Sequence, residues 1–352
     1  MHDFTEAISY ATAHEVAWPR DPHAEPARWG VHHDDPPPFN RLRGPVHARG
    51  GVSGVIRVGG REVAAWGEPD RADLTFSVAK TYLALLAGLA LARGLIASAD
   101  ETVASRLPGI GFDDPHNRAI TWAHLLEQVS EWQGTCFGMP DQVEHHRKVA
   151  HDPKPPTGRK GEARALQPPG SYWEYNDVRI NQLSLALLHL FCRPLPDVFQ
   201  EAVLGPIGGG ADWRWVGYDD AWVEIDGRRM QSVPGGTHWG GGVSISARDQ
   251  ARIGRLLLSD GLHEGRQLLP ADWVRRMREP CSIAPFYGWL TWLNREGQLF
   301  ADASRASSFM IGAGGHYVWM EPEHDAVVVV RWLDSARAPG FVSRVTRALR
   351  AA

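Results

Sequence analysis

The hydrophobic and polar positions near the start of the chain predict a β-hairpin followed by a long buried helix. Residues 51–58 and 61–66 are two short apolar runs that flank the glycine pair at 59–60. Such a pattern is typical of two antiparallel strands joined by a tight turn. Residues 75–97 carry leucines at helical spacing and have Gly94 near their end, which predicts one long, buried helix.

The remainder of the chain alternates helical and strand-like patterns with polar stretches. Ser246 is followed three residues later by Asp249, which indicates a capping box at a helix start. Residues 138–170 are polar and rich in proline, which predicts a long surface loop. The other predicted elements are helices at 177–192, 247–259 and 340–350, and strands at 286–293, 309–320 and 325–333.

The order of these elements predicts two structural units. We expect residues 1–98 and 243–352 to form one discontinuous α/β domain, in which residues 1–48 are an irregular N-terminal arm. Residues 99–242 are expected to form a mostly helical insertion domain that carries the long loop.

The composition excludes several classes of protein. A 43% hydrophobic fraction with 22% charged residues is ordinary for a globular chain, and the net charge of −4 argues against a nucleic-acid binder. Three cysteines far apart predict neither a disulfide framework nor a cysteine zinc site. The first thirty residues lack the apolar core of a signal peptide, and no apolar run is long enough to cross a bilayer. These observations predict a cytoplasmic protein without a membrane or nucleic-acid partner.

Only four of the 37 basic residues are lysines, and one of them, Lys80, lies in the most apolar predicted helix. Ser77 precedes it by three positions, so the two side chains share a helix face. A desolvated lysine has a lowered pKa and can take the proton of a serine nucleophile, which a guanidinium cannot do. The alternative is a surface serine beside a lysine whose amine reaches solvent.

Two further stretches carry candidate chemistry. Tyr175 and Asp177 directly precede a predicted helix, and a tyrosine beside a cationic lysine can act as a general base. Asp177 can hydrogen-bond the lysine or cap the helix, and the alternative for Tyr175 is an ordinary buried tyrosine. The glycine-rich run 312–315 lies inside a predicted strand, which indicates close approach of a ligand or a plain β-bulge. The N–H of His316, which follows it, is a candidate donor to an oxyanion.

The order S-x-x-K, a Y-x-N-like motif and a glycine-rich strand resembles the serine β-lactamase and penicillin-binding-protein superfamily. Within it, the chain is similar to the class C-like serine hydrolases, which include esterases and amidases. Residues 169–177, 240–249 and 313–331 match further family patterns, so the resemblance covers about 50 to 350. It implies an α+β, β-lactamase/transpeptidase-like fold in which an antiparallel sheet is flanked by helices and carries a helical insertion.

The resemblance also implies a serine hydrolase that cleaves an ester or amide of a small molecule. Ser77 would form an acyl-enzyme, Lys80 and Tyr175 would share the proton transfers, and the N–H groups of Ser77 and His316 would hold the oxyanion. No cofactor or metal is expected. Candidate substrate-binding residues are Gly314, Gly315, His316, Asp177, Trp132 and Trp173, together with the loop 138–168.

Two departures from the family pattern bear on substrate and base. Ala313 and Gly314 stand where β-lactamases and carboxypeptidases have a cation and a hydroxyl, which makes a β-lactam or a D-Ala-D-Ala terminus less suitable unless arginines elsewhere restore a carboxylate anchor. Asp177 replaces an asparagine, and its charge would raise the pKa of Lys80, which favours Tyr175 as a helper base. The open alternatives are an acyltransferase, a β-lactamase or D-aminopeptidase-type peptidase, and a non-catalytic binding protein of the same fold.

Overall fold

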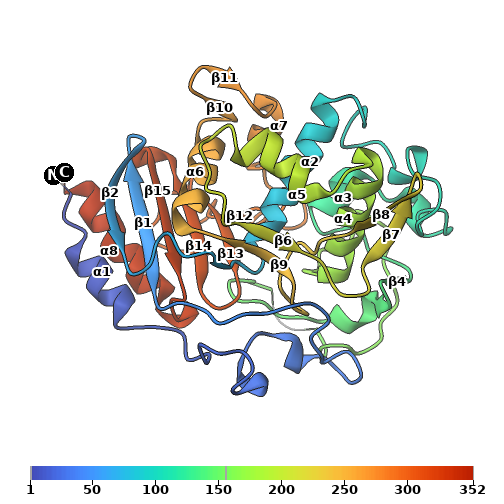
Figure 1. Ribbon diagram of the computed structural model, residues 1–352, viewed down its shortest axis with the longest axis horizontal. Helices are drawn as coiled ribbons and strands as arrows, with labels where there is room; N and C mark the ends of the chain where they lie inside the picture. Colours follow the sequence, from blue (N-terminus) through green and yellow to red (C-terminus); the bar gives the residue numbers. More distant parts are fainter. Residues whose placement is uncertain (1, 155–156, 352) are drawn as a thin grey trace.

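A six-stranded antiparallel sheet with helices on both faces forms one half of the molecule (Figure 1). The computed structural model describes residues 2–154 and 157–351. The strands of the sheet follow the order β12 (Trp292–Leu293), β13 (Ser308–Gly312), β14 (His316–Glu321), β15 (Ala326–Arg331), β1 (Ser53–Val58) and β2 (Arg61–Trp66).

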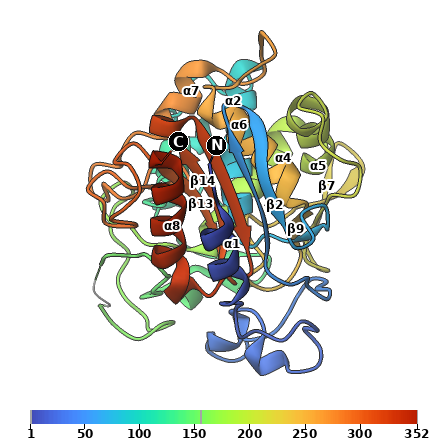
Figure 2. The same cartoon turned by 90° about the vertical axis from the view of Figure 1, so that its left-hand side faces the viewer.

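Two helices from opposite ends of the chain cover one face of this sheet, and others cover the second face. Helix α1 (Thr5–Thr12) packs beside α8 (Ala338–Arg350), as the view in Figure 2 shows. On the other face, α6 (Ala247–Leu258) packs on the central strands and α2 (Val78–Ala92) on β13. Strand β15 is buried along its whole length, which explains why its valines form a continuous run instead of alternating with polar residues.

The other half of the molecule is built around helix α4 (Asp177–Phe191), which packs against α2. Helix α2 is therefore enclosed by the sheet on one side and by helices on the other, and thirteen of its residues are buried. A helix surrounded in this way is apolar on every side. The remaining helices are α3 (Trp122–Leu126), α5 (Leu195–Phe199) and α7 (Ala271–Arg276).

Short strands form small sheets outside the main one. Strands β3 (Asp73–Leu74), β9 (Gly242–Ile245) and β6 (Arg214–Val216) make a three-stranded sheet, and β3 is the strand that precedes α2 in the chain. The two-stranded sheets are β4 (Thr135–Cys136) with β5 (Met139–Pro140), β7 (Trp222–Ile225) with β8 (Arg228–Gln231), and β10 (Leu262–His263) with β11 (Arg266–Gln267).

The N-terminal arm runs along the lower edge of the molecule in Figure 1 and joins its two halves. It was expected to be irregular, but it contains α1 and a short 3₁₀ turn at His32–Asp34. Backbone N–H groups of Arg43 and Gly44 donate to the carbonyl oxygen of Trp239, which ties the arm to the segment before β9.

Several predicted elements are confirmed, and two require correction. The hairpin, with Gly59 and Gly60 at positive φ, is β1–β2. The helix expected at 75–97 is the shorter α2: it begins at Val78, because the chain up to Thr75 is still bonded to β9, and it ends at Ala92. The strand expected at 309–320 is wrong as a single element: β13 and β14 form a hairpin whose turn is the glycine-rich segment. Of 286–293, only the last two residues are a strand. The division into two domains stays a prediction.

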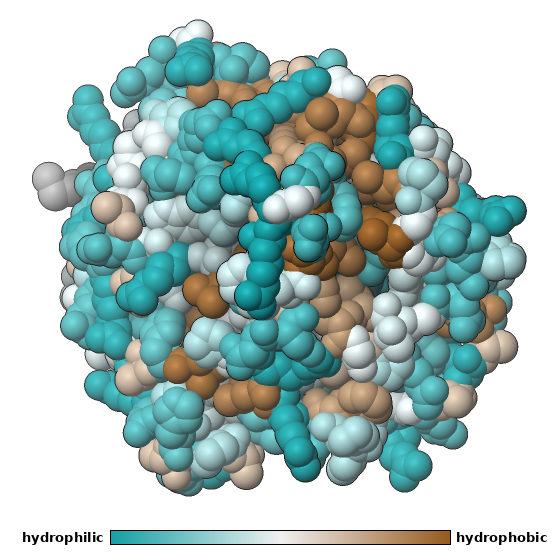
Figure 3. Space-filling view, turned by 45° about the vertical axis from the view of Figure 1, so that its right-hand side comes forward, coloured by the Kyte–Doolittle hydropathy of each residue, from teal (hydrophilic) through white to brown (hydrophobic). Residues whose placement is uncertain are grey.

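The surface shows few large apolar side chains. Four large hydrophobic residues are exposed in the described part of the chain. The face in Figure 3 is mostly hydrophilic, with a large hydrophobic area in its upper part and smaller ones below it. Among the described residues, no helix combines the length and the apolar character needed to cross a membrane.

Candidate active site

Ser77 occupies the N-cap position of α2, at the point where the chain turns out of β3. Its side chain makes no capping hydrogen bond to the helix, which leaves the hydroxyl free for other contacts. The preceding residue, Phe76, has φ +51°, a strained conformation for a residue with a side chain. The ring of Phe76 packs against Trp18 and Trp332, and this aromatic packing holds the strained turn in place.

Lys80 lies one helical turn beyond Ser77, and its Nζ donates to Ser77 Oγ at 2.8 Å. The lysine is 1% exposed, and its Nζ also contacts a carboxylate oxygen of Asp177. Burial lowers the pKa of Lys80, and the nearby Asp177 opposes that shift without reversing it. The amine therefore lies within reach of the serine hydroxyl, and its pKa is lower than that of an ordinary lysine.

Tyr175 brings its ring beside both of these groups from the segment before α4. Lys80 Nζ lies 4.8 Å from the centre of the ring, and Tyr175 lines the same cavity as Ser77. Burial raises the pKa of Tyr175, although a hydrogen bond with Ser77 acts in the opposite direction. The raised pKa favours the protonated phenol, and the role of Tyr175 as a general base stays a prediction.

Asp177 is the first residue of α4, and its two carboxylate oxygens face different partners. One oxygen accepts from Lys80, and the other accepts from Arg147. His238 Nδ1 lies 3.0 Å from that second oxygen. These cations hold the pKa of Asp177 well below its usual range, although burial acts against them. Asn176, not Asp177, caps the helix by accepting from two backbone N–H groups.

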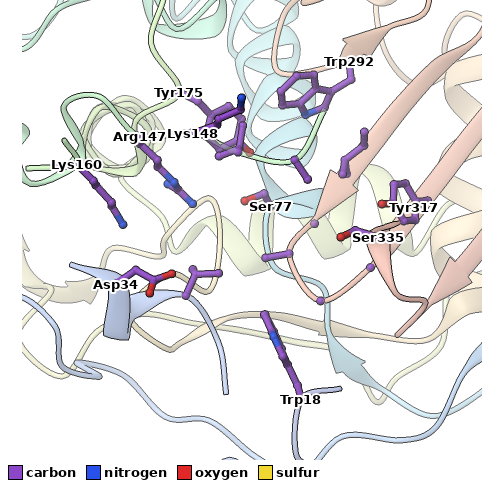
Figure 4. Close-up of a pocket in the computed structure, with 18 residues that line it drawn as sticks. Trp18, Asp34, Ser77, Arg147, Lys148, Lys160, Tyr175, Trp292, Tyr317 and Ser335 are labelled. Carbon is purple, nitrogen blue, oxygen red and sulfur yellow. The ribbon is translucent and has the colours of Figure 1, made fainter. Parts of the chain in front are cut away.

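A cavity of about 270 Å³ opens above Ser77 (Figure 4). Arg147, Lys148 and Lys160 line one side of it, and they come from the long polar loop. The N-terminal arm contributes Trp18 and Asp34 to the same cavity. The cavity walls are thus built from three distant parts of the sequence.

The glycine turn between β13 and β14 forms the opposite wall. Ala313, Gly314 and Gly315 line the cavity, and the role of the two glycines in substrate binding stays a prediction. Gly315 has φ +77°, and a Cβ at this position would lie 1.5 Å from the carbonyl oxygen of Leu333. His316 does not line the cavity: it is fully buried in β14, and its ring packs on Trp332.

The two tryptophans expected in the substrate site lie elsewhere. Trp132 packs edge-on against Phe112 in the core and does not line this cavity. Trp173 lines a smaller, neighbouring cavity that shares Tyr175 with the first. Sequence reasoning missed Arg147, His238 and the arm residues, since none of them belongs to a periodic element.

Substitution of Gly315 by alanine is expected to destabilise the protein well beyond the cost of positive φ alone. Gly265→Ala is the matched control, because Gly265 also has φ +77° but has no atom within 4 Å of its missing Cβ. In urea unfolding, the free energy of unfolding should fall by about 1 kcal/mol in the control. In Gly315→Ala it should fall by at least about 2 kcal/mol more. Equal losses in the two variants would contradict the close approach to Leu333.

At the start of α2, beside the main sheet, a serine hydroxyl thus lies within hydrogen-bond reach of a buried lysine. The Beta-lactamase family model matches residues 39–351, and the chain therefore belongs to this family of hydrolases. The antiparallel sheet flanked by helices is the β-lactamase/transpeptidase-like fold, as expected.

Individual relatives are distant. The 6-aminohexanoate-dimer hydrolase of Paenarthrobacter ureafaciens is 28% identical over 118 residues, which cover 31% of this chain and only 30% of that enzyme. A crystal structure from Bacteroides dorei DSM 17855 covers 99% of this chain and 100% of its own, with a TM-score of 0.66 and 17% identity. A D-stereospecific amidohydrolase from Streptomyces sp. covers 84% of this chain and 92% of its own, with a TM-score of 0.55 and 18% identity.

Proposed function

We propose that this protein hydrolyses an ester or amide bond of a small molecule through an acyl-enzyme on Ser77. The observation that carries the proposal is the 2.8 Å contact between Ser77 Oγ and Nζ of the buried Lys80, at the floor of an open cavity. The Ser77 side chain makes no helix-capping bond, and the Lys80 side chain is buried. Lys80 can take the proton that Ser77 must lose to attack a carbonyl carbon. A cytoplasmic location stays a prediction of the sequence alone.

In acylation, Ser77 Oγ attacks the carbonyl carbon while its proton moves to Lys80. The oxyanion that forms accepts from the N–H of Ser77, which points out of the first turn of α2. Because His316 does not line the cavity, we propose the N–H of Ala313 as the second donor: Ala313 is the first residue after β13, and it lines the cavity. The protonated Tyr175 then passes a proton to the leaving group and recovers one through Lys80.

In deacylation, water attacks the ester of Ser77 and loses its proton to the same pair of groups. The acid product leaves, and the proton returns to Ser77 Oγ. Every proton taken from a nucleophile is thus delivered to a leaving group, and no cofactor takes part in a step. An alcohol or amine in place of water would make the protein an acyltransferase.

The charges around the cavity favour a substrate that carries an anionic group. Arg147 and Lys160 line the cavity but are paired with Asp177 and Asp35. Lys148 lines it as well, is exposed, and has no carboxylate within ion-pair distance in the parts of the chain that the structure describes. Asp34 is the one carboxylate among these lining residues, so positive charge predominates.

Removal of the Lys148 charge is therefore expected to weaken the binding of anionic substrates selectively. Lys148→Met should raise KM about three- to fivefold for a carboxylate-bearing ester and leave KM for a neutral ester unchanged. The control is Arg159→Met, which removes a cation from the same loop at an exposed position away from the cavity. Equal changes in KM for both esters, or the same effect in the control, would argue against this role.

The proposal as a whole is tested by trapping the acyl-enzyme. The protein is mixed with a panel of short and long acyl esters, amides and a chromogenic β-lactam, quenched, and digested for mass spectrometry. We expect an acyl adduct on the peptide that contains Ser77. Addition of an alcohol acceptor distinguishes hydrolysis from acyl transfer by the products. Absence of any adduct from folded protein, with a fluorophosphonate probe included, would support a non-catalytic binding protein.

A further inference from the structure

A buried histidine lies behind the proposed base, and both of its ring nitrogens face carboxylates. His238 Nδ1 is 3.0 Å from an oxygen of Asp177, and His238 Nε2 is 2.8 Å from an oxygen of Asp35. The side chain of His238 is 1% exposed, and the two carboxylates are equally enclosed. Asp177 is the residue that pairs with Lys80, so one carboxylate separates His238 from the base.

These contacts define the protonation state of His238. A neutral imidazole carries one N–H, so its second nitrogen would present a lone pair to a carboxylate oxygen. Protonation of Asp35 would not resolve this conflict, because its oxygens already accept from Trp239 Nε1 and from Lys160. Asp177 likewise accepts on both oxygens. The ring is therefore an imidazolium that donates to both carboxylates, in agreement with the raised pKa of His238, whose desolvation is outweighed by these anions.

The charges of the buried cluster balance without Lys80. Its three carboxylates are Asp35, Glu144 and Asp177, and its cations other than Lys80 are Arg147, Lys160 and His238. Lys160 Nζ lies near both Asp35 and Glu144, at 3.6 Å from the latter, so an ammonium already occupies the space between these carboxylates. A proton on Lys80 would add an uncompensated positive charge to a buried site, which is costly.

We propose that His238 is a positioning residue, held as an imidazolium by Asp35 of the N-terminal arm. The imidazolium donates to Asp177 and compensates its negative charge. Lys80 therefore stays unprotonated and can take the proton of Ser77. The proposal rests on the proposed function. The proton that moves is the hydroxyl proton of Ser77, which goes to Lys80 and later to the leaving group, while His238 keeps both of its protons. The groups that face His238 from the arm, the loop, α4 and α2 are His32, Asp35, Glu144, Arg147, Lys160, Asp177 and, through Asp177, Lys80.

The protonation state is measured directly on the wild-type protein. Long-range ¹H–¹⁵N spectra of histidine-labelled protein distinguish an imidazolium from either neutral tautomer, and loss of one signal set in His238→Gln assigns the residue. We expect the doubly protonated pattern to persist above the ordinary histidine pKa, at pH 8. A neutral tautomer at that pH would overturn the proposal, and this reading does not depend on any enzymatic activity.

The effect on the base is measured by the rate at which a fluorophosphonate labels Ser77, as a function of pH. In His238→Gln, Asp177 loses a cation and pulls a proton onto Lys80, so the acid limb of the profile should move up by about one to two pH units. Labelling should fall about 10- to 100-fold near neutral pH and recover at alkaline pH. The control is His47→Gln, an exposed histidine outside the cluster, which should leave the profile unchanged.

The outcomes of these two experiments distinguish failure of the role proposed for His238 from failure of the proposed serine hydrolase function. A loss of labelling in His238→Gln that is equal at every pH would indicate a merely structural role and overturn the proposal. A second outcome is that the spectra show an imidazolium but the fluorophosphonate never labels the wild-type protein. This result would confirm the charge state of His238 and refute the serine hydrolase function on which its role depends.

Discussion

Replacement of Ser77 by alanine is expected to abolish turnover and covalent labelling while the protein stays folded. The variant loses the atom that attacks the carbonyl, and removal of a serine nucleophile from such sites costs on the order of 10⁴- to 10⁶-fold in kcat. The side chain makes no helix-capping bond, so the fold has little use for its hydroxyl. The measurement is kcat for a chromogenic ester together with the intact mass after exposure to a fluorophosphonate.

Ser335→Ala is the matched control for this experiment. Ser335 is an exposed serine that lines the same cavity, but its hydroxyl has no contact with a base. The control should keep wild-type turnover and the adduct. An adduct that survives in Ser77→Ala, or one that disappears in Ser335→Ala, would show that the nucleophile has been assigned to the wrong residue.

Replacement of Lys80 by arginine is expected to keep the positive charge but remove the proton acceptor. A guanidinium stays protonated at any accessible pH, so kcat should fall about 10²- to 10⁴-fold. Wild-type activity should rise with pH as Lys80 loses its proton, and because burial lowers its pKa, this rise should lie below the range of an ordinary lysine. The arginine variant should show no such rise.

The control for Lys80 is a second partly buried lysine. Lys154 donates to the carbonyl oxygen of Trp173, a contact that an arginine can also make, so Lys154→Arg should retain turnover. Circular dichroism verifies that both variants are folded. Near-normal kcat in Lys80→Arg would rule out proton transfer by this residue.

The sequence revealed the part of the site that depends on local geometry. Ser77 and Lys80 are three residues apart on one helix, so the helical repeat alone brings them together. The valine run of β15 and the Gly59-Gly60 turn predicted strands of the sheet, because both patterns reflect local preferences of the backbone. Helix α1 was missed, since it lies in a stretch that begins among polar residues and is followed by many prolines.

The remaining parts of the site depend on contacts that no local pattern records. Arg147 reaches Asp177 from an irregular loop, and His238 meets Asp35 across 203 positions of sequence. The glycines at 312–315 were placed within a strand because glycine is compatible with a bulge and a turn alike, and only the pairing of β13 with β14 distinguishes the two.

The contact between Asp35 and His238 has a consequence for the order in which the protein assembles during synthesis. Asp35 leaves the ribosome 203 residues before its partner, a delay of roughly 10 to 40 seconds at typical elongation rates. Until then, a carboxylate that ends up buried must remain hydrated. The arm around Asp35 is polar and rich in proline. A segment of this composition stays solvated and does not collapse early onto an apolar surface. The complete charge cluster therefore cannot form before residue 238 has been synthesised.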